Sequence, residues 1–307
     1  MTKAFHLTTF GESHGIAVGG VIEGCPSGLK IDQQRIQYDL ARRATASTTF
    51  ASQRKEADVV EFLSGLLDGV TLGTPIAFMV RNTDAHPEDY EAMKEVFRPS
   101  HADYTYQQKY GIRDWRGGGR ASARTMLPYV VAGSIAKQWL ETLNIKVTAE
   151  VLSIGGMTDP VKMEALLAQC RAEGDTVGGV VHGSIVGLRA GLGEPLDDKF
   201  QACLAKVMFT IPAVKGFEYG DGFSMASMRG SEANDSMVVN EDGTVRFLTN
   251  HSGGIQGGIT NGETVFFNVA FKPIPTLGKG DRHDVCALPR AAVIVEAMAA
   301  LTTVRFL

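Results

Sequence analysis

The residues from Pro289 to Leu301 constrain the fold more than any other part of this chain. Pro289 fits the first turn of a helix, where a missing N–H group is no loss, and most of the side chains that follow are apolar. A helix that is apolar on all sides must be buried on all sides. We therefore expect a central helix that reaches Leu301, with other layers of secondary structure packed around it.

The remaining periodicity mixes helices and strands without a strict βαβ rhythm. Asp32 is a candidate N-cap for one helix, and Val131, Ile135 and Trp139 lie on one stripe of another. The expected helices are 32–43, 128–143, 161–170 and 289–301, and the expected strands are 17–22, 75–80, 146–153, 177–188 and 264–271. We predict a single α+β domain over residues 1–307, or a sandwich with helices between sheets.

Composition argues against several classes of protein. The 307 residues carry a net charge of −4, unlike a general nucleic-acid binder. The four cysteines are far apart and form no Cys-x-x-Cys or Cys/His cluster, so neither a metal site nor a disulfide framework is expected. The N-terminus lacks an apolar signal region, and no run approaches the ~20 apolar residues of a membrane-spanning helix. We expect a cytoplasmic protein that binds neither nucleic acid nor a membrane.

The first polar string, Gly11 to Gly15, places His14 among glycines. Glycine lets the backbone turn sharply and approach a ligand closely. The imidazole titrates near neutral pH, which suits acid–base work. A turn with a satisfied histidine is the competing interpretation. A serine hydrolase that uses Ser13 is rejected, because adjacent side chains in an extended segment point to opposite sides.

The second string runs from Arg98 to Tyr104 and contains His101 and Asp103. Pro99 stiffens its start, and the Asp103 carboxylate could orient the His101 imidazole. A solvated polar loop explains the string equally well.

The third string, Gly117 to Arg124, is rich in glycine and arginine. At the N-terminus of a helix it would present free N–H groups and a positive dipole end to an anion. Arg120 and Arg124 would add charge-assisted hydrogen bonds. The string is neither a P-loop nor a Gly-x-Gly-x-x-Gly dinucleotide fingerprint. A phosphate or carboxylate site is favoured over a plain turn.

Three further segments suit an anionic or flat ligand. Arg43 lies in the last turn of the first helix, where the dipole alone would also favour a cation. The glycine pairs within 253–258 allow close backbone approach, or they form a flexible turn. Asp284 follows Arg282 and His283 just before the apolar helix, and His283 is equally well explained as a solvated loop residue.

Together these strings resemble the chorismate synthase family from about Phe10 to about Met298. The resemblance implies a β-α-β sandwich with a helical core flanked by antiparallel β-sheets. It implies a carbon–oxygen lyase of the shikimate pathway, which removes phosphate from 5-enolpyruvylshikimate 3-phosphate by 1,4-elimination to give chorismate. It further implies reduced FMN (FMNH2) without net redox change, an external flavin reductant, an association with NADP, and a homotetramer.

The resemblance also assigns roles to residues. His14 would protonate the departing phosphate, His101 would keep the reduced flavin correctly protonated, and Asp284 would assist proton removal through the flavin N5. The implied flavin contacts are Arg120, Ala121, Ser122, Pro212, Ala213, Gly257, Lys272, Pro273, Ile274, Pro275, Thr276 and Arg282. The implied substrate contacts are Ser13, Arg43, Arg98, Ser122 and Arg124.

The chain departs from the family pattern at several positions. Thr49 stands where a second arginine is common, and Pro212 stands where asparagine is usual. The stretches 154–161 and 276–282 are shorter than in the family. Either both loops are truly deleted, or residues are missing from the sequence there. The second interpretation is favoured and predicts backbone breaks near Gly155 and near Thr276.

Two alternatives remain open. A flavin-dependent oxidoreductase acting on a small anionic substrate would share the glycine-rich loops. It would need hydride from a nicotinamide, and no Rossmann fingerprint is present. A non-catalytic anion-binding module would explain the glycines and arginines but would leave His14, His101 and Asp284 without a task.

Overall fold

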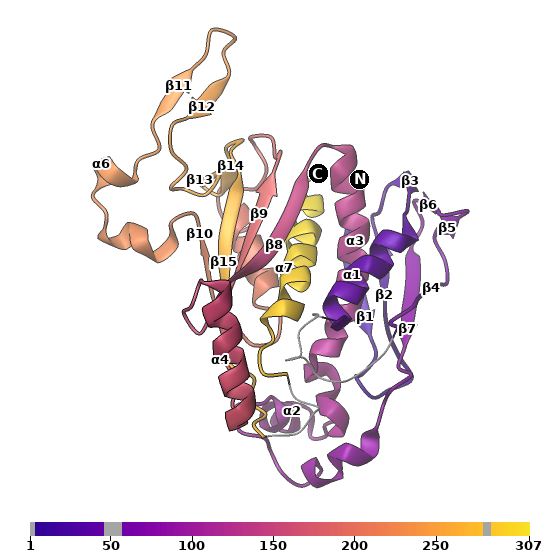
Figure 1. Ribbon diagram of the computed structural model, residues 1–307. Coiled ribbons are helices and arrows are strands. Elements are labelled where there is room, and N and C mark those ends of the chain that lie inside the picture. Colours follow the sequence, from indigo (N-terminus) through magenta and orange to yellow (C-terminus); the bar gives the residue numbers. More distant parts are fainter. Residues whose placement is uncertain (1–3, 46–56, 279–283) are drawn as a thin grey trace.

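The last long helix is the central element of the structure. The computed structural model describes residues 4–45, 57–278 and 284–307. This helix, α7 (Leu288–Thr303), has layers of secondary structure on both sides (Figure 1). Its residues are buried almost throughout. The expectation of a central apolar helix is therefore confirmed, and the helix continues two residues beyond Leu301.

One antiparallel sheet covers one side of the helices. Its strands, in spatial order, are β1 (His6–Phe10), β2 (Ala17–Glu23), β7 (Ile76–Arg81) and β4 (Val60–Phe62). Along β7 every second residue is buried, namely Ile76, Phe78 and Val80, as expected for a strand with one face on a core. A smaller sheet on the same side comprises β3 (Ser27–Lys30), β6 (Val70–Leu72) and β5 (Leu66–Leu67) (Figure 1).

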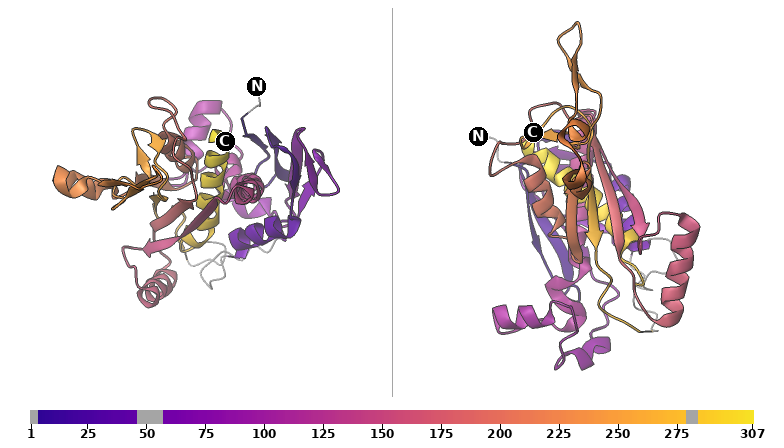
Figure 2. Two further views of the ribbon diagram at one scale, coloured as in Figure 1. Left: turned by 90° about the horizontal axis from the view of Figure 1, so that it is seen from above. Right: turned by 90° about the vertical axis from the view of Figure 1, so that its left-hand side faces the viewer.

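A second antiparallel sheet lies on the opposite side of the helices (Figure 2). Its strands, in spatial order, are β10 (Val214–Tyr219), β15 (Val265–Phe271), β9 (Gly179–Val186) and β8 (Lys146–Ile154). In β15 the buried residues again alternate, with Val265, Phe267 and Val269 fully shielded from solvent. Two helices belong to this half of the chain, α4 (Pro160–Glu173) and α5 (Phe200–Met208).

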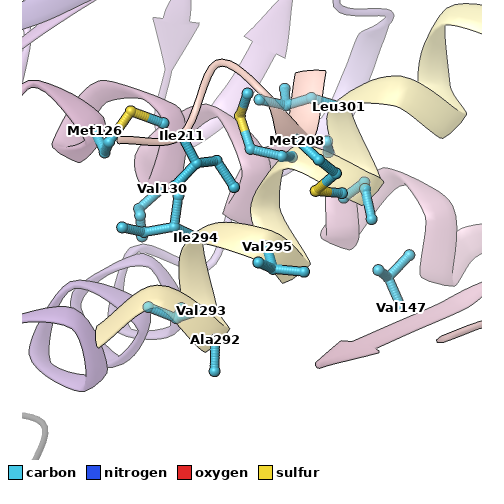
Figure 3. Close-up of a cluster of buried hydrophobic side chains, with 14 of the residues drawn as sticks. Met126, Val130, Val147, Met208, Ile211, Ala292, Val293, Ile294, Val295 and Leu301 are labelled. Atoms are coloured by element: carbon cyan, nitrogen blue, oxygen red, sulfur yellow. The ribbon is translucent and has the colours of Figure 1, made fainter. Parts of the chain in front are cut away.

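The helical layer between the sheets consists of α1 (Gln33–Thr45), α3 (Leu127–Thr142) and α7. Figure 3 shows part of its core, where Val130 of α3 lies beside Ile294 of α7. Val295 of α7 and Val147 of β8 belong to the same core. Because the sheets on both sides are antiparallel and the helices lie between them, the predicted α+β class, a helical core flanked by antiparallel β-sheets, is confirmed.

Charged side chains also connect the three helices. Arg42 of α1 donates two hydrogen bonds to the Glu296 carboxylate of α7, at 3.1 and 3.0 Å. Lys137 of α3 pairs with Glu296 and lies 2.7 Å from Asp39 of α1, which itself lies 3.1 Å from Arg42. Asp39 and Glu296 are buried, so removing one cation would leave a costly buried charge. This charged quartet fixes the last turns of α1 against α3 and α7.

The remaining elements lie toward the two ends of the sandwich. The end that carries α2 contains η1 (Pro87–Met93), α2 (Asp103–Tyr110), η2 (Arg116–Ala121) and η3 (Ala123–Met126). The other end contains η4 (Gly222–Ser227), α6 (Gly230–Ala233), β11 (Met237–Val239), β12 (Val245–Phe247), β13 (Ile255–Gln256), β14 (Ile259–Thr260) and η5 (Val304–Phe306). The β11–β12 hairpin projects well away from the body of the molecule (Figure 1).

The backbone is continuous through Gly155. The N–H groups and carbonyls of Ile154 and Met157 exchange two hydrogen bonds, of 3.0 and 2.9 Å, and α4 begins at Pro160. The break predicted near Gly155 is therefore wrong. The matching prediction near Thr276 concerns a stretch whose residues 279–283 lie outside the described part of the chain.

Replacing Gly133 by alanine should destabilise the fold. An added Cβ would lie 2.4 Å from the Cβ of Ala297 on α7, too close for two carbon atoms. Alanine gains about 1 kcal/mol of helix propensity over glycine, but overpacking a tight contact costs about 1–3 kcal/mol or more. We expect a net loss of unfolding free energy in a urea titration. Gly230→Ala in α6 is the control, because a Cβ there meets nothing within 4 Å. Equal stability of the two variants would contradict this packing.

Candidate active site

Two histidines meet at one glycine-rich segment. Gly117, Gly118 and Gly119 in η2 have φ angles of 58°, 84° and 52°, a region that side-chain-bearing residues rarely adopt. A Cβ at Gly117 would lie 2.1 Å from Cε1 of His14, and a Cβ at Gly118 would lie 3.0 Å from Cε1 of His101. The bare backbone of this segment therefore packs directly against both imidazoles.

His14 shares a tight turn with Ser13. The Ser13 Oγ lies 3.0 Å from Nδ1 of His14, and it donates to the carbonyl oxygens of Arg116 and Gly117 at 3.3 Å. The geometric argument against a serine hydrolase is therefore wrong, since this turn lets adjacent side chains meet. Ser13 is nevertheless fully buried, with its hydroxyl held by backbone carbonyls, so it is not presented to a substrate as a nucleophile.

Asp103 organises the second polar string. Its buried carboxylate accepts hydrogen bonds of 2.7 and 2.9 Å from the Arg98 guanidinium and lies 2.9 Å from Nδ1 of His101. Arg113 adds a further cation at 3.6 Å. Burial alone would raise the pKa of Asp103, but the hydrogen bonds from Arg98 and the neighbouring positive charges outweigh it and lower the pKa to about 2.

His101 is held in its neutral form. Burial lowers its pKa below the ordinary value for histidine, and the positive charge of Arg98 lowers it further, while Asp103 opposes both effects only in part. The imidazole therefore carries no charge near pH 7. Asp103 lies where it can orient His101, as the sequence suggested.

Asp58 joins two of the predicted substrate arginines. Its carboxylate accepts hydrogen bonds from Arg43 at 3.1 Å and from Arg124 at 3.0 Å, and all three side chains are buried. Burial lowers the pKa of Arg43; the charge of Asp58 opposes this, and the charge of Arg124 adds to it. Among the described residues, Nε of Arg43 has no hydrogen-bond partner. Sequence analysis missed Asp58, because nothing near it distinguishes it from an ordinary surface carboxylate.

The glycine-rich string leads into a 3₁₀ turn rather than directly into an α-helix. Ser122 caps η3 by accepting from the backbone N–H of Arg124 at 3.4 Å, and α3 begins only at Leu127. The expected site at an α-helix N-terminus is therefore wrong in this detail. Arg120 instead donates to the carbonyl of Gly11 at 3.0 Å and to Thr9 Oγ1 at 2.8 Å, which joins the string to the end of β1.

The end of β15 brings a further group of predicted residues to the His101 loop. Lys272 donates through Nζ to the carbonyl of Ser100 at 3.2 Å and through its backbone N–H to the carbonyl of Ala213 at 2.9 Å. Lys272 therefore connects this loop to Ala213. Ala213 has a φ of 71°, which is rare for a residue other than glycine.

Asp284 lies shortly before α7 and contacts an arginine of that helix. Its carboxylate is 3.3 Å from Nη2 of Arg290 in the first turn of that helix. The charge of Arg290 in turn helps to lower the pKa of Arg43, which links Asp284 to the Asp58 cluster. Three residues from the sequence analysis, Thr49, His283 and the predicted flavin ligand Arg282, lie outside the described part of the chain.

Gly257 lies apart from the other described site residues. It belongs to the turn between β13 and β14, near the Val265 end of β15, whereas Lys272 follows the opposite end (Figure 1). The seven residues of β15 span roughly 20 Å at the usual rise of a strand. Within one chain, Gly257 is therefore far from Lys272.

A hollow of about 270 Å³ opens beside the glycine segment. Its lining includes Tyr106, Tyr110, Arg113 and the segment from Gly118 to Ala121, together with the acidic residues Glu12, Asp103 and Asp114. Aromatic faces and backbone without Cβ atoms suit a flat ring, and guanidinium groups suit a phosphate. These residues fit FMN. Among the described residues, no His, Cys, Asp or Glu cluster is arranged for a metal ion, and no helix is long and apolar enough to cross a membrane.

Comparison with known proteins decides the family. A family model described as chorismate synthase matches residues 5–307. The chain belongs to the chorismate synthase family. The curated chorismate synthase of Porphyromonas gingivalis is 48% identical over 341 aligned positions, which cover 98% of this chain and 93% of that relative. The chorismate synthase of Christiangramia forsetii is 50% identical over 339 positions, which cover 97% of this chain and 94% of that relative.

The fold agrees with the family. A crystal structure of a chorismate synthase matches with a TM-score of 0.82 at 28% sequence identity, covering 100% of this chain and 92% of that one. As a family member, the chain is a carbon–oxygen lyase acting on phosphates in the shikimate pathway, as predicted, and the oxidoreductase alternative is not favoured. The alignment of 341 positions exceeds the 307 residues of this chain, so the relative has residues that this chain lacks.

Replacing Asp103 by asparagine should destabilise the protein and change its acid sensitivity. The change leaves buried arginine charges without their carboxylate, which costs about 3–5 kcal/mol. The pKa of Asp103, about 2 in the fold, lies below the ~3.9 of an unfolded aspartate. Its stabilising effect is therefore complete above about pH 4 and is lost as the pH falls toward 2. Urea titrations should show a smaller loss of stability for the variant than for the wild type across this range. Asp197→Asn, at an exposed site, is the control. An Asp103 variant as stable as this control would refute the role of Asp103.

Proposed function

We propose that this chain catalyses the 1,4-elimination of phosphate from 5-enolpyruvylshikimate 3-phosphate to give chorismate, with reduced FMN as cofactor. The observation that supports it best is the glycine segment that contacts both His14 and His101. Two imidazoles, of which that of His101 is neutral, thus adjoin one backbone surface, with arginines nearby. This combination suits a reaction in which a phosphate must be bound, protonated and released.

Arginine side chains are proposed to bind the anionic groups of the substrate. The substrate carries carboxylate and phosphate groups, which guanidinium groups bind through paired hydrogen bonds. Arg43, Arg98 and Arg124 are the proposed ligands, with Ser122 as a neutral one. Ser13, whose buried hydroxyl is held by backbone carbonyls, is not among them. Each of these arginines already contacts a carboxylate, Asp58 or Asp103, that orients it and offsets its charge before the substrate arrives.

The proton transfers are assigned to His14 and Asp284. In the elimination a ring C–H bond breaks, its electron pair enters the new conjugated diene, and the allylic C–O bond breaks as phosphate departs. His14 donates the proton that the departing phosphate takes up, and Asp284 assists removal of the ring proton. His101, which is neutral, provides a hydrogen-bonding partner without adding positive charge.

Residues from separate segments would hold the cofactor. Arg120 and Ala121 line the hollow and Ser122 follows them in the chain, while Lys272 contacts the His101 loop and Ala213. Pro212, Pro273, Ile274, Pro275 and Thr276, which neighbour Ala213 and Lys272 in the chain, complete the proposed set. Reduced FMN, when bound, supplies electron density transiently to the breaking C–O bond and regains it, so that no net redox change occurs. An external reductant is proposed to keep the flavin reduced.

A homotetramer is the proposed assembly. The segment from η4 to the projecting β11–β12 hairpin exposes large apolar side chains, with Phe223 of η4 and Met237 and Val239 of β11 at 80%, 64% and 69% exposure. An isolated two-stranded ribbon is only marginally stable in water, so a partner surface would stabilise it. A second copy would also let Gly257 approach a site in another chain. We further propose a single domain over residues 1–307 that works in the cytoplasm.

The decisive experiment mixes purified protein with 5-enolpyruvylshikimate 3-phosphate and photoreduced FMN under anaerobic conditions. We expect stoichiometric release of phosphate and formation of chorismate, while the absorbance of the reduced flavin returns to its starting value. Stoichiometric flavin oxidation would instead indicate an oxidoreductase. Binding without phosphate release would indicate a non-catalytic anion-binding module.

Replacing His14 by alanine should lower kcat by about 10²–10⁴-fold, the usual contribution of a positioned acid or base. Substrate affinity and fold should change little. His6→Ala is the matched control, because His6 is exposed on β1 and its ring forms a hydrogen bond with nearby Thr8, on the strand itself. Turnover of the His14 variant within a few-fold of wild type, measured with reduced FMN, would remove His14 from the mechanism.

A further inference from the structure

Asn82 lies directly after β7, at the point where this strand meets the turn that carries His14. Its backbone N–H donates to the carbonyl of Ile16 at 3.0 Å, which continues the pairing of β7 with β2 beyond Arg81 and Ala17. The backbone of Asn82 therefore completes the sheet without help from its side chain. The side-chain amide is therefore available for hydrogen bonds outside the sheet.

The amide nitrogen of Asn82 closes the His14 turn. Nδ2 donates to the carbonyl oxygens of Glu12 at 3.0 Å and of Gly15 at 2.8 Å. These two residues flank Ser13 and His14, and the Gly15 N–H also donates to the Glu12 carbonyl at 3.1 Å. One side chain thus holds both ends of the turn in place.

The amide oxygen of Asn82 contacts a proposed substrate ligand. Oδ1 accepts a hydrogen bond of 2.5 Å from Nε of Arg124. The other two nitrogens of this guanidinium donate to Asp58 at 3.0 Å and to the carbonyl of Arg81 at 3.3 Å. The reverse amide orientation would place NH₂ against a cation and an oxygen against two carbonyls, so the network permits one orientation of Asn82.

We propose that Asn82 is a positioning residue that couples the His14 turn to the Arg124 guanidinium. The proposal rests on the proposed function, because it assumes that His14 and Arg124 act on the same substrate. A substrate anion that engages Arg124 acts, through one amide, on the turn that aims the imidazole. Asn82 thereby fixes the position of the His14 imidazole relative to the Arg124 guanidinium.

The central test is Asn82→Asp. The variant keeps an acceptor for Arg124 but replaces the two N–H donors with an oxygen that faces the Glu12 and Gly15 carbonyls. We expect kcat to fall by about 10–100-fold while KM changes less than about threefold, because the variant removes alignment in the transition state rather than ground-state binding. Asn82→Ala removes both contacts without adding charge, so we expect kcat to fall and KM to rise.

A double-mutant cycle separates positioning from general stability. If Asn82 acts through His14, then Asn82→Asp should cost less than about threefold in kcat when made in the His14→Ala background. An equal fold-loss in both backgrounds would overturn the proposal. Asn240→Asp is the control for the same chemical change. The Asn240 amide donates to Thr244 in an exposed turn, so this variant should leave kcat unchanged.

A readout without turnover keeps this proposal distinct from the proposed function. In protein labelled with ¹⁵N at histidine, the His14 imidazole signals, assigned by their absence in His14→Ala, should shift in Asn82→Asp and in Asn82→Ala but not in Asn240→Asp. Unchanged signals in both Asn82 variants would refute the positioning role. A wild type that releases no phosphate would refute the proposed function, while the shift of the imidazole signals would still decide the role of Asn82.

Discussion

The close contact between α3 and α7 is the constraint on which the rest of the structure depends. Gly133 has no side chain, so the backbone of α3 approaches Ala297 more closely than any Cβ would allow. This brings two apolar helices together as one layer, and each face of the layer supports an antiparallel sheet. Because the interior is close-packed, widening this contact would displace both sheets and the loops at their ends.

The charged quartet connects the helical layer to the candidate active site. Glu296 lies in the middle of α7 and binds Arg42, so it fixes the turn of α1 that also bears Arg43. Arg43 then meets Asp58, and Asp58 meets Arg124 at the end of the glycine-rich string. The network of ion pairs thus runs from the core to the proposed substrate ligands in two parts, which the backbone of α1 joins between Arg42 and Arg43. Its carboxylates keep the arginines charged and oriented in a region shielded from water.

Much of the fold could be predicted from the sequence, because strong periodicity depends only on neighbouring residues. The apolar residues after Pro289 indicated a buried central helix, and the stripe through Val131 and Ile135 indicated α3. The sequence also identified His14, His101 and the glycines at 117–119 as candidates, since each stands in a distinctive local string. It failed where local reasoning assumed the wrong backbone: Ser13 and His14 lie in a turn, so their side chains meet.

What the sequence by itself determined is the set of chemical groups and the elements that carry them. Glycines that tolerate positive φ, arginines that bind anions and imidazoles that titrate near neutral pH are properties of residue types. Only the tertiary structure decided which groups touch. Asp58, Asn82 and Arg124 lie far apart in the chain, and their contacts depend on strand register and on how closely helices pack. No local pattern encodes such contacts, because they follow from the three-dimensional packing of the whole chain.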